Sequence, residues 1–203
     1  RIVPSLPDAL AAKYRNDLTF NPGMSRLDPP LIYPDYKSTR KRGPLAPLVV
    51  AGDVMKDLPA PHFGERFFVP HDADLTIRGK SIPLGERMVL HGKITDETGA
   101  PVRNSLVEIW QANASGRYDH PVDKHDAPLD PNFNGWGKAL TDSEGNYRFI
   151  TIRPGAYPWK NHAFAWRPAH IHFSLFGNAY AQRLVTQMYF PGDPFLTIDP
   201  IYQ

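Results

Sequence analysis

Short runs of alternating apolar and polar side chains constrain the fold of this chain more than any other feature of its sequence. Over Arg87–Ile94, for example, Met88 and Leu90 alternate with His91 and Lys93. A period of two places successive side chains on opposite faces of a β-strand. The chain also carries 22 prolines and 15 glycines in 203 residues, spread without a repeat. This combination predicts many short strands joined by turns.

The strand pattern occurs in six segments, which are Arg87–Ile94, Ser105–Gln111, Lys138–Thr141, Tyr147–Ile152, Ala169–Phe176 and Arg183–Phe190. The turn sequence DETGAPV joins the first two segments and DSEGN joins the next two, so each pair is predicted to form a hairpin. Several short strands with almost no helix predict an all-β fold, namely an antiparallel β-sandwich with long loops and an extended N-terminal arm.

The sequence changes character at about residue 86. Residues 1–86 show little periodicity beyond one short helix predicted at Pro7–Tyr14, and Pro29–Pro47 is rich in proline. We expect this part to be an extended arm that packs on the sandwich or on a partner chain. Residues 87–203 are then the β-sandwich that carries the functional site, so that the chain forms a single functional domain.

Composition excludes several classes of protein. Hydrophobic residues make up 41% and charged residues 22% of the chain, as in ordinary globular proteins, and the net charge is +2. There are no cysteines, which excludes disulfides and thiolate metal sites. The short basic run Lys37–Arg42 is expected to be a solvated surface or a subunit contact rather than a nucleic-acid site. Without a membrane-spanning run or a signal-peptide pattern, a cytoplasmic protein is expected that binds neither nucleic acid nor membrane.

Two long segments do not fit the strand pattern. They are residues 116–137, GRYDHPVDKHDAPLDPNFNGWG, and residues 153–168, RPGAYPWKNHAFAWRP, and both are rich in aromatic residues, proline and histidine. Long loops of this kind in a compact domain are usually functional. Because both lead into predicted strands, a rigid scaffold could hold their side chains in place.

A pair of histidines in WRPAHIHFSL is the first candidate for chemistry. His170 and His172 lie two residues apart on a predicted strand, so both imidazoles leave the same face. Neutral imidazole is a common ligand of zinc, copper and iron, and two such rings can chelate one ion. Taken alone, the pair does not choose among these metals, and histidines buried against backbone acceptors are the commoner alternative.

Further ligands have to come from elsewhere in the chain. The HExxH motif of zinc hydrolases is absent, no acidic residue follows the pair closely, and cysteine is unavailable. The remaining donors are several aspartates and a set of loop residues, which are His120, His125, His162, Tyr118 and Tyr157.

Four stretches, LVEIWQANASGRY, LDPNF, LTDSEGNYRFITIRPGAYPW and WRPAHIHFSL, resemble the intradiol ring-cleaving dioxygenases. The resemblance runs from about Pro34 to Ile201, includes YPDYKS in the N-terminal arm, and is greatest to the β chains of the enzymes that cleave protocatechuate. It implies a non-haem Fe(III) enzyme that opens the ring of protocatechuate (3,4-dihydroxybenzoate) with O2 to give 3-carboxy-cis,cis-muconate. It also implies a hetero-oligomer with an α chain of the same enzyme.

The resemblance implies four iron ligands in this chain. Tyr157 and His172 match the axial pair, while Tyr118 and His170 match the equatorial pair beside a hydroxide. It further implies that Tyr157 leaves when a catechol binds. The chemistry agrees with this, because a phenol of pKa about 10 ionises at neutral pH only beside a strong Lewis acid. Fe(III), two phenolates and one hydroxide also sum to zero charge, which limits the cost of burial.

The resemblance adds candidates around the iron. Arg167 would stabilise charge on the reacting ring, and Gln187 would hydrogen-bond His170 or line the oxygen pocket. Ordinary alternatives are a surface salt bridge for Arg167 and a sheet-face position for Gln187. Trp110, Trp159 and Ile201 match positions on the wall of the substrate pocket, and the alternative for each is core packing. Tyr36 matches a residue that contacts the substrate carboxylate.

The sequence departs from the family in two places. Between Tyr118 and Leu129 it differs, so His120 and His125 could add a ligand or change the pocket rim. The chain also ends at Gln203, where family members continue into a further strand, so we expect a truncated sandwich. The alternatives are a catechol or hydroxyquinol 1,2-dioxygenase and an inactive β-sandwich binding paralogue.

Overall fold

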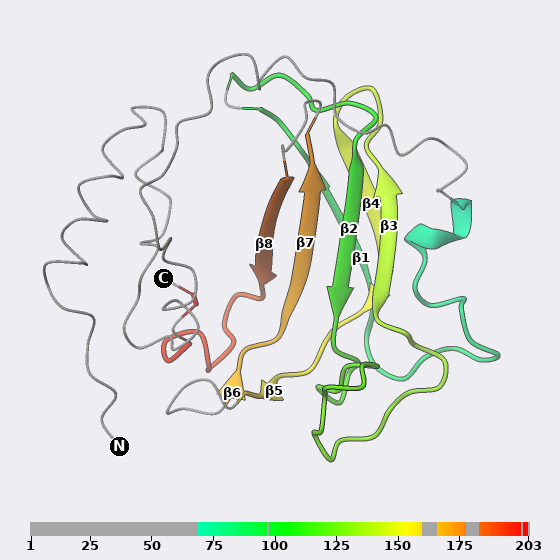
Figure 1. Ribbon diagram of the computed structural model, residues 1–203, viewed down its shortest axis with the longest axis vertical. Helices are drawn as coiled ribbons and strands as arrows, with labels where there is room; N and C mark the ends of the chain where they lie inside the picture. The colour runs from blue at the N-terminus through cyan, green and yellow to red at the C-terminus, as the bar shows by residue number, and fades with distance from the viewer. Residues whose placement is uncertain (1–68, 97, 160–165, 178–182, 200, 203) are drawn as a thin grey trace, which may run out of the picture. The chain divides into compact units, whose positions relative to one another are not determined.

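The computed structural model describes residues 69–96, 98–159, 166–177, 183–199 and 201–202. Within these ranges the regular secondary structure is almost entirely β-strand, and long loops join the strands, as Figure 1 shows. The elements are one 3-10 turn and eight strands: η5 (Pro70–Ala73), β1 (Arg87–Lys93), β2 (Leu106–Gln111), β3 (Trp136–Leu140), β4 (Asn146–Ile152), β5 (Tyr157–Pro158), β6 (Trp166–Arg167), β7 (His170–Phe176) and β8 (Arg183–Tyr189). The predicted all-β class is confirmed.

The strands form two facing antiparallel sheets and one small ribbon. The larger sheet has the order β3-β2-β7-β8, and β1 pairs with β4 in the second sheet, which lies behind the first in Figure 1. Strands β5 and β6 form a two-residue ribbon below the sheets. The two sheets enclose a common apolar core, as in the predicted β-sandwich.

Alternation explains which side chains enter the core. Leu90 and Phe149 are cross-strand neighbours in the β1–β4 sheet, and both are buried. Ile171 and Phe173 of β7 point toward them from the larger sheet, beside Ile109 of β2. Burying one such side chain contributes about 1.5–3 kcal/mol. Because the core takes the odd-numbered positions of β7, the even-numbered positions face away from it.

Both predicted hairpins are wrong, although the turns themselves form. Strand β1 pairs with β4, not with β2, and β3 pairs with β2, not with β4. In the first turn the amide of Asp96 donates to the carbonyl of Ala100. In the second turn the amide of Asp142 donates to the carbonyl of Asn146. Beyond each turn the chain crosses to the opposite sheet. Alternation reports which face of a strand is buried, but not which strand lies beside it.

The chain divides into two compact units. One comprises residues 52–158 and 166–196 and contains all the strands; the other comprises residues 1–51, 159–165 and 197–203. The predicted N-terminal arm up to residue 68 and its helix lie outside the described residues, so the division at residue 86 stays a prediction. No helix in the described ranges has the length and apolar character needed to cross a membrane.

Two glycines bring the long loops together. Gly116, at φ +77°, lies so close to residue 156 that a Cβ would overlap the carbonyl oxygen of Ala156. A Cβ on Gly155 would likewise overlap the backbone of Ala114 and Gly116, and the amide of Gly155 donates to the carbonyl of Asn113. A side chain on either glycine would push apart the two segments that lead to Tyr118 and Tyr157.

We expect Gly116→Ala to destabilise the protein more than Gly99→Ala. Both glycines have positive φ, which costs an alanine about 1–2 kcal/mol, but a Cβ on Gly99 would meet open space. The overlap at Gly116 should add about 1–3 kcal/mol, measured by urea unfolding of both variants. Equal losses in the two variants would show that the close approach of the loops is not needed for stability.

Candidate metal centre

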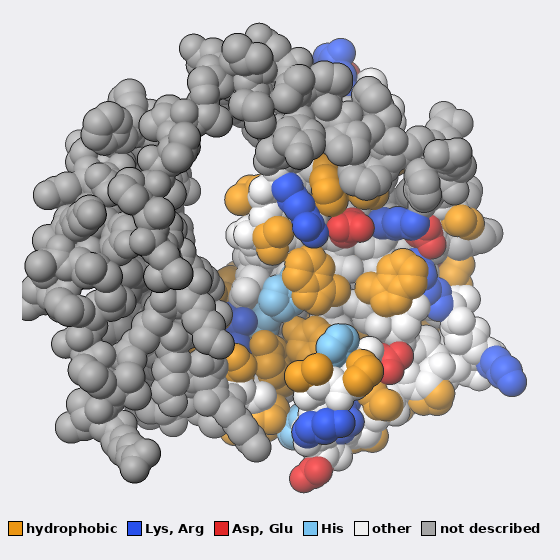
Figure 2. All heavy atoms as spheres, viewed as in Figure 1, with side chains coloured by type: hydrophobic (Ala, Val, Ile, Leu, Met, Phe, Trp, Pro, Cys, Tyr) orange, Lys and Arg blue, Asp and Glu red, His pale blue; other side chains and the backbone are white. Residues whose placement is uncertain are grey.

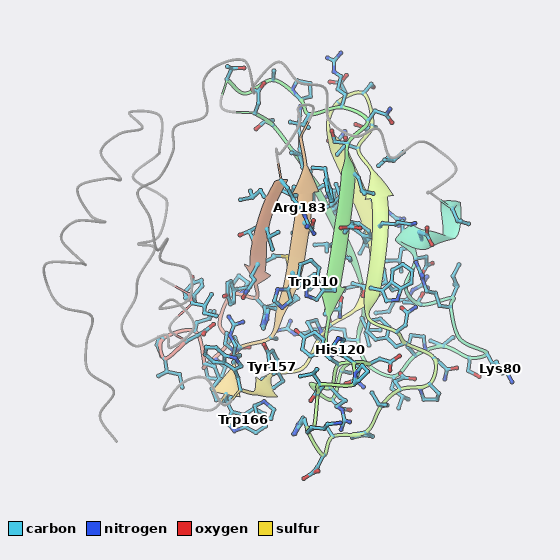
Figure 3. All side chains as sticks on the ribbon, in the orientation of Figure 1. Lys80, Trp110, His120, Tyr157, Trp166 and Arg183 are labelled. Carbon is cyan, nitrogen blue, oxygen red and sulfur yellow. The ribbon has the colours of Figure 1, made fainter. Side chains whose placement is uncertain are left out.

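The candidate site lies where β7 meets the β5–β6 ribbon and the loop that carries Tyr118. Figure 3 shows Tyr157 between Trp110 of the sheet and Trp166 of the ribbon. In Figure 2, histidine side chains on this face adjoin hydrophobic ones. The four residues that the resemblance assigned as ligands come from three different segments, so their convergence is a property of the fold.

His170 is held in one orientation and one tautomer. It is 2% exposed, and its Nδ1 lies 2.7 Å from the carbonyl oxygen of Pro168, to which it must donate. A neutral ring that donates from Nδ1 presents a lone pair at Nε2. That nitrogen lies 3.2 Å from Nε2 of His172. Two nitrogens that bind one ion at about 2.1 Å, roughly 90–110° apart, are separated by about 3.0–3.4 Å.

The plane of His172 is fixed by an aromatic stack. Trp110 lies directly opposite on β2, with ring centroids 4.7 Å apart and ring planes at 3°. This contact gives Trp110 a definite place beside the candidate ligand set. Its predicted contact with a substrate stays a prediction.

Both imidazoles are neutral at neutral pH. Burial, followed by the charge of Arg167, lowers the pKa of His170 to about 4. Burial, followed by His170 and then Arg167, lowers the pKa of His172 to about 3. A neutral imidazole is the form that binds a metal ion, so the two rings need no deprotonation to serve as ligands.

The two tyrosines complete the group of rings. Tyr118 and Tyr157 meet edge to face at 5.2 Å between centroids, Tyr157 lies 5.5 Å from His170, and Tyr118 lies 6.4 Å from His172. The hydroxyl of Tyr118 is fully buried and has no hydrogen-bond partner among the described residues. Burial and the neighbouring Tyr157 raise the pKa of Tyr118. A buried polar atom without a partner is costly, and a bound cation would satisfy this one.

Local hydrogen bonds explain how the loops present these tyrosines. The side chain of Asn113 accepts from the amides of Ser115 and Arg117, which forms the turn before Tyr118. The amide of Tyr118 donates to Asp123. On the other loop, Tyr157 pairs directly with Arg167 across the β5–β6 ribbon.

The donor set consists of two imidazoles and two phenols. In the part of the chain that the structure describes, no three His, Cys, Asp or Glu side chains gather to hold an ion. Among the described residues, the phenols of Tyr118 and Tyr157 are further oxygen donors that lie beside His170 and His172. The residues present fit a metal ion that accepts phenolate oxygen, and ligation itself stays a prediction.

Arg167 is a buried cation beside the rings, so the alternative of a surface salt bridge is wrong. It is 2% exposed, and its Nη1 lies 3.2 Å from Nε2 of His170. Its Nη2 donates to Oε1 of Gln187 and to the hydroxyl of Tyr189, each at 2.8 Å. The Oε1 of Gln187 accepts from Arg167 and Tyr189, and its predicted place in the oxygen pocket stays a prediction.

The other predicted residues have mixed outcomes. His125 packs edge-on against Trp166 on the outer face of the ribbon, 5.9 Å between centroids, and His120 is exposed. Neither lies among the four converging rings. Trp159 and Ile201 belong to the other compact unit, so their place on a pocket wall stays a prediction. Two residues lie outside the described ranges, namely Tyr36 and His162.

Tyr189 is the residue that sequence reasoning missed. It lies two positions after Gln187 on β8, so alternation places both on one face of the strand, and the pairing of β7 with β8 puts it opposite His170. Its hydroxyl donates to Oε1 of Gln187 at 2.7 Å. The strand pattern therefore contained a signal that could have found it.

Comparison with known proteins gives two matching family models. The Dioxygenase model matches residues 58–203, and the model of the protocatechuate 3,4-dioxygenase beta subunit N terminal matches residues 29–51. The chain is 59% identical over 177 residues to the protocatechuate 3,4-dioxygenase beta chain of Burkholderia cepacia, which covers 86% of this chain and 75% of that relative. It is 35% identical over 134 residues to the catechol 1,2-dioxygenase of Candida albicans, covering 61% of this chain and 43% of that relative.

Solved structures show the same architecture. The 3-chlorocatechol 1,2-dioxygenase of Rhodococcus opacus is 28% identical with a TM-score of 0.51, covering 66% of this chain and 57% of that one. The dioxygenase domain of a carbohydrate-binding fusion from a Streptomyces species is 27% identical with a TM-score of 0.50, covering 71% of this chain and 83% of that one. The Candida and Rhodococcus enzymes therefore extend well beyond the region that this chain matches.

The two lowered histidine pKa values predict how the stability of the metal-free protein depends on pH. An unfolded histidine titrates near 6.5, so between pH 6.5 and about 4 the unfolded chain binds protons at His170 and His172 that the folded protein does not. The free energy of unfolding should therefore decrease as the pH falls through this window. Each histidine adds a slope of up to about 1.4 kcal/mol per pH unit.

Urea unfolding of the chelator-treated protein between pH 6.5 and 4.5 measures this slope. The variant His172→Gln should reduce the slope by up to about 1.4 kcal/mol per pH unit. The matched control His120→Gln changes an exposed histidine outside the candidate ligand set and shows whether the loss of any one histidine has this effect. An unchanged slope in His172→Gln would contradict the burial of a neutral imidazole at this position.

Proposed function

The chain belongs to the intradiol ring-cleaving dioxygenase family, and we propose that it acts as the β chain of a protocatechuate 3,4-dioxygenase. The reaction inserts both atoms of O2 while the bond between the two hydroxylated carbons breaks, and protocatechuate becomes 3-carboxy-cis,cis-muconate. The 59% identity to the Burkholderia beta chain and the match of residues 29–51 to a beta-subunit model support this substrate and this subunit.

The proposed cofactor is non-haem Fe(III), held by Tyr118, Tyr157, His170 and His172. Two observations carry the proposal: the buried hydroxyl of Tyr118 has no hydrogen-bond partner among the described residues, and the Nε2 atoms of His170 and His172 lie 3.2 Å apart. Hard phenolate oxygens favour a trivalent ion over a divalent one, and two phenolates balance most of its charge. When bound, the ferric ion supplies the Lewis acidity that ionises the phenols and activates a catecholate ring toward O2.

Tyr157 is proposed to accept a proton from the incoming catechol at its phenol oxygen. The fold supports a movable side chain here, because Tyr157 lies on a ribbon only two residues long. His170 and His172, by contrast, lie on a seven-residue strand that is paired on both sides. The histidines are thus the fixed half of the ligand set and Tyr157 the half that can leave.

Arg167 is proposed to stabilise negative charge on the reacting ring. In the structure its guanidinium contacts groups on His170, Gln187 and Tyr189, and all three of these groups are uncharged. In a buried site a fixed cation interacts with developing charge more strongly than it would in water. The guanidinium adjoins Nε2 of His170, so it faces the space that a ligand of the four rings would occupy.

The proposed partner is the α chain of the same enzyme, and Tyr36 of the N-terminal arm is proposed to contact the carboxylate of the substrate. The beta-subunit match over residues 29–51 includes Tyr36 and supports this assignment. A location in the cytoplasm stays a prediction. The alternatives are a catechol or hydroxyquinol 1,2-dioxygenase and a binding protein without iron, and a spectroscopic and a kinetic experiment separate all three.

The first experiment is spectroscopic. Protein from iron-replete expression together with an α chain should be red-brown, because phenolate-to-Fe(III) charge transfer absorbs visible light. Tyr118→Phe and Tyr157→Phe should each shift or weaken this band, whereas the matched control Tyr147→Phe changes a tyrosine of the sandwich core and should not. Metal analysis accompanies each spectrum. A colourless, iron-free protein would contradict the proposed function and favour the binding protein.

The second experiment identifies the substrate. Protocatechuate should perturb the visible band anaerobically and then consume one O2 per molecule in air, with formation of the carboxylated muconate. Catechol and hydroxyquinol, which lack the carboxylate, should show a kcat/KM lower by at least about 10-fold, because they forgo a charge-assisted contact. A higher kcat/KM for catechol or hydroxyquinol would replace the proposed substrate with that compound.

A further inference from the structure

The side chains of Arg167, Gln187 and Tyr189, beside the candidate ligands, form a ring of hydrogen bonds. Nη2 of Arg167 donates to Oε1 of Gln187 and to the hydroxyl of Tyr189, both at 2.8 Å. The Tyr189 hydroxyl in turn donates to the same Oε1 at 2.7 Å. The hydroxyl therefore both accepts and donates within this group, and a phenylalanine could do neither.

Strand β8 places this group by its register. Tyr189 lies directly opposite His170, and Gln187 lies opposite His172. The ring of Tyr189 also packs beside His170, with centroids 5.7 Å apart, and the guanidinium carbon of Arg167 lies 6.0 Å from the centre of that ring. One residue of β8 thus contacts both the candidate metal ligand and the candidate charge stabiliser.

The two ends of the guanidinium face different partners. Nη2 is anchored on β8, whereas Nη1 points to Nε2 of His170 at 3.2 Å. Nε2 has one lone pair, because Nδ1 of the same ring donates to Pro168. That lone pair cannot both bind a metal ion and accept from Arg167. Ligation by His170 would therefore replace the contact between this nitrogen and Nη1, and Nη1 could then donate to a ligand in the site while Nη2 keeps its contacts on β8.

We propose that Tyr189 is a positioning residue that fixes the guanidinium of Arg167, so that Nη1 is directed toward the bound catecholic substrate. This proposal rests on the proposed function. Without Tyr189, Gln187 would offer Nη2 only one acceptor. With Tyr189 there are two acceptors, and the hydrogen bond between them keeps both in place. Together they fix the plane of the guanidinium. Misplacement of a catalytic group by about 1 Å can cost about 100-fold in rate, so orientation at this position is consequential.

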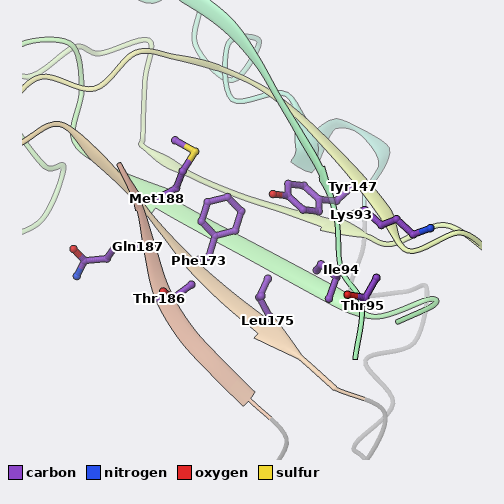
Figure 4. Close-up of a pocket in the computed structure, with 9 residues that line it drawn as sticks. All are labelled: Lys93, Ile94, Thr95, Tyr147, Phe173, Leu175, Thr186, Gln187 and Met188. Carbon is purple, nitrogen blue, oxygen red and sulfur yellow. The ribbon is translucent and has the colours of Figure 1, made fainter. Parts of the chain in front are cut away.

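The test is the variant Tyr189→Phe in the holoenzyme with its α chain. We expect kcat for protocatechuate to fall about 10- to 100-fold, with KM within about 3-fold of the wild type, because Arg167 acts on developing charge rather than on substrate binding. Iron content and the visible band should match the wild type, since no proposed ligand is changed. The matched control is Tyr147→Phe, which removes a tyrosine hydroxyl at the pocket of about 350 Å³ between the sheets (Figure 4) and should leave kcat unchanged.

A double-mutant cycle separates positioning from a general structural role. If Tyr189 acts through Arg167, adding Tyr189→Phe to Arg167→Ala should cause no further loss of kcat. Additive losses would overturn the proposal, as would a Tyr189→Phe enzyme with wild-type kcat. An inactive wild type would overturn the proposed function and, with it, the assignment of a catalytic effect to Tyr189.

A measurement on the metal-free protein tests directly whether Tyr189 restrains the side chain of Arg167. In the metal-free protein, nitrogen NMR of the arginine side chains should show slow rotation of the Arg167 guanidinium and slow exchange of its protons in the wild type. In Tyr189→Phe both should become at least about 10-fold faster, since one of the two acceptors of Nη2 is lost. Unchanged rotation and exchange would overturn the positioning role even if kcat falls, and this result is independent of whether the enzyme turns over.

Discussion

The pairing of β7 between β2 and β8 is the constraint on which the rest of the structure depends. Its register directs Ile171 and Phe173 into the core and presents His170 and His172 on the opposite face. A slip by one residue would exchange these faces, placing the imidazoles among the aliphatic side chains of the core and the core residues beside the loops of the candidate site. The hydrophobic requirement of the sandwich therefore fixes the position of both histidines on the face of the candidate site.

Much of the fold could be predicted because alternation is a local property. The six predicted segments agree with β1–β4, β7 and β8 to within two residues at each end. The partners could not be predicted in this way, because DETGAPV and DSEGN form tight turns whether the flanking strands share a sheet or cross between sheets. The ribbon of β5 and β6 was also missed, since two residues are too few to show a period.

The candidate site was predicted unevenly for the same reason. Alternation alone placed His170 and His172 on one face, but Tyr118 and Tyr157 lie in loops without periodicity and were assigned only by resemblance to a family. Their convergence depends on backbone contacts at Gly116 and Gly155, far in sequence from the histidines. Tyr189 is the opposite case. It lies within a segment that was predicted as a strand, but its proposed role follows only from its hydrogen bonds to Arg167 and Gln187.

The arrangement divides the site into a rigid part and an adjustable part. The histidines, Gln187 and Tyr189 lie on seven-residue strands of one sheet, so ordering them adds little to the cost of folding the sandwich. Tyr157 lies on the short ribbon, where few backbone hydrogen bonds resist movement. Arg167 joins the two parts, because its backbone belongs to the ribbon and its guanidinium is fastened to β8. Movement of Tyr157 can therefore occur while the cation beside it stays in place.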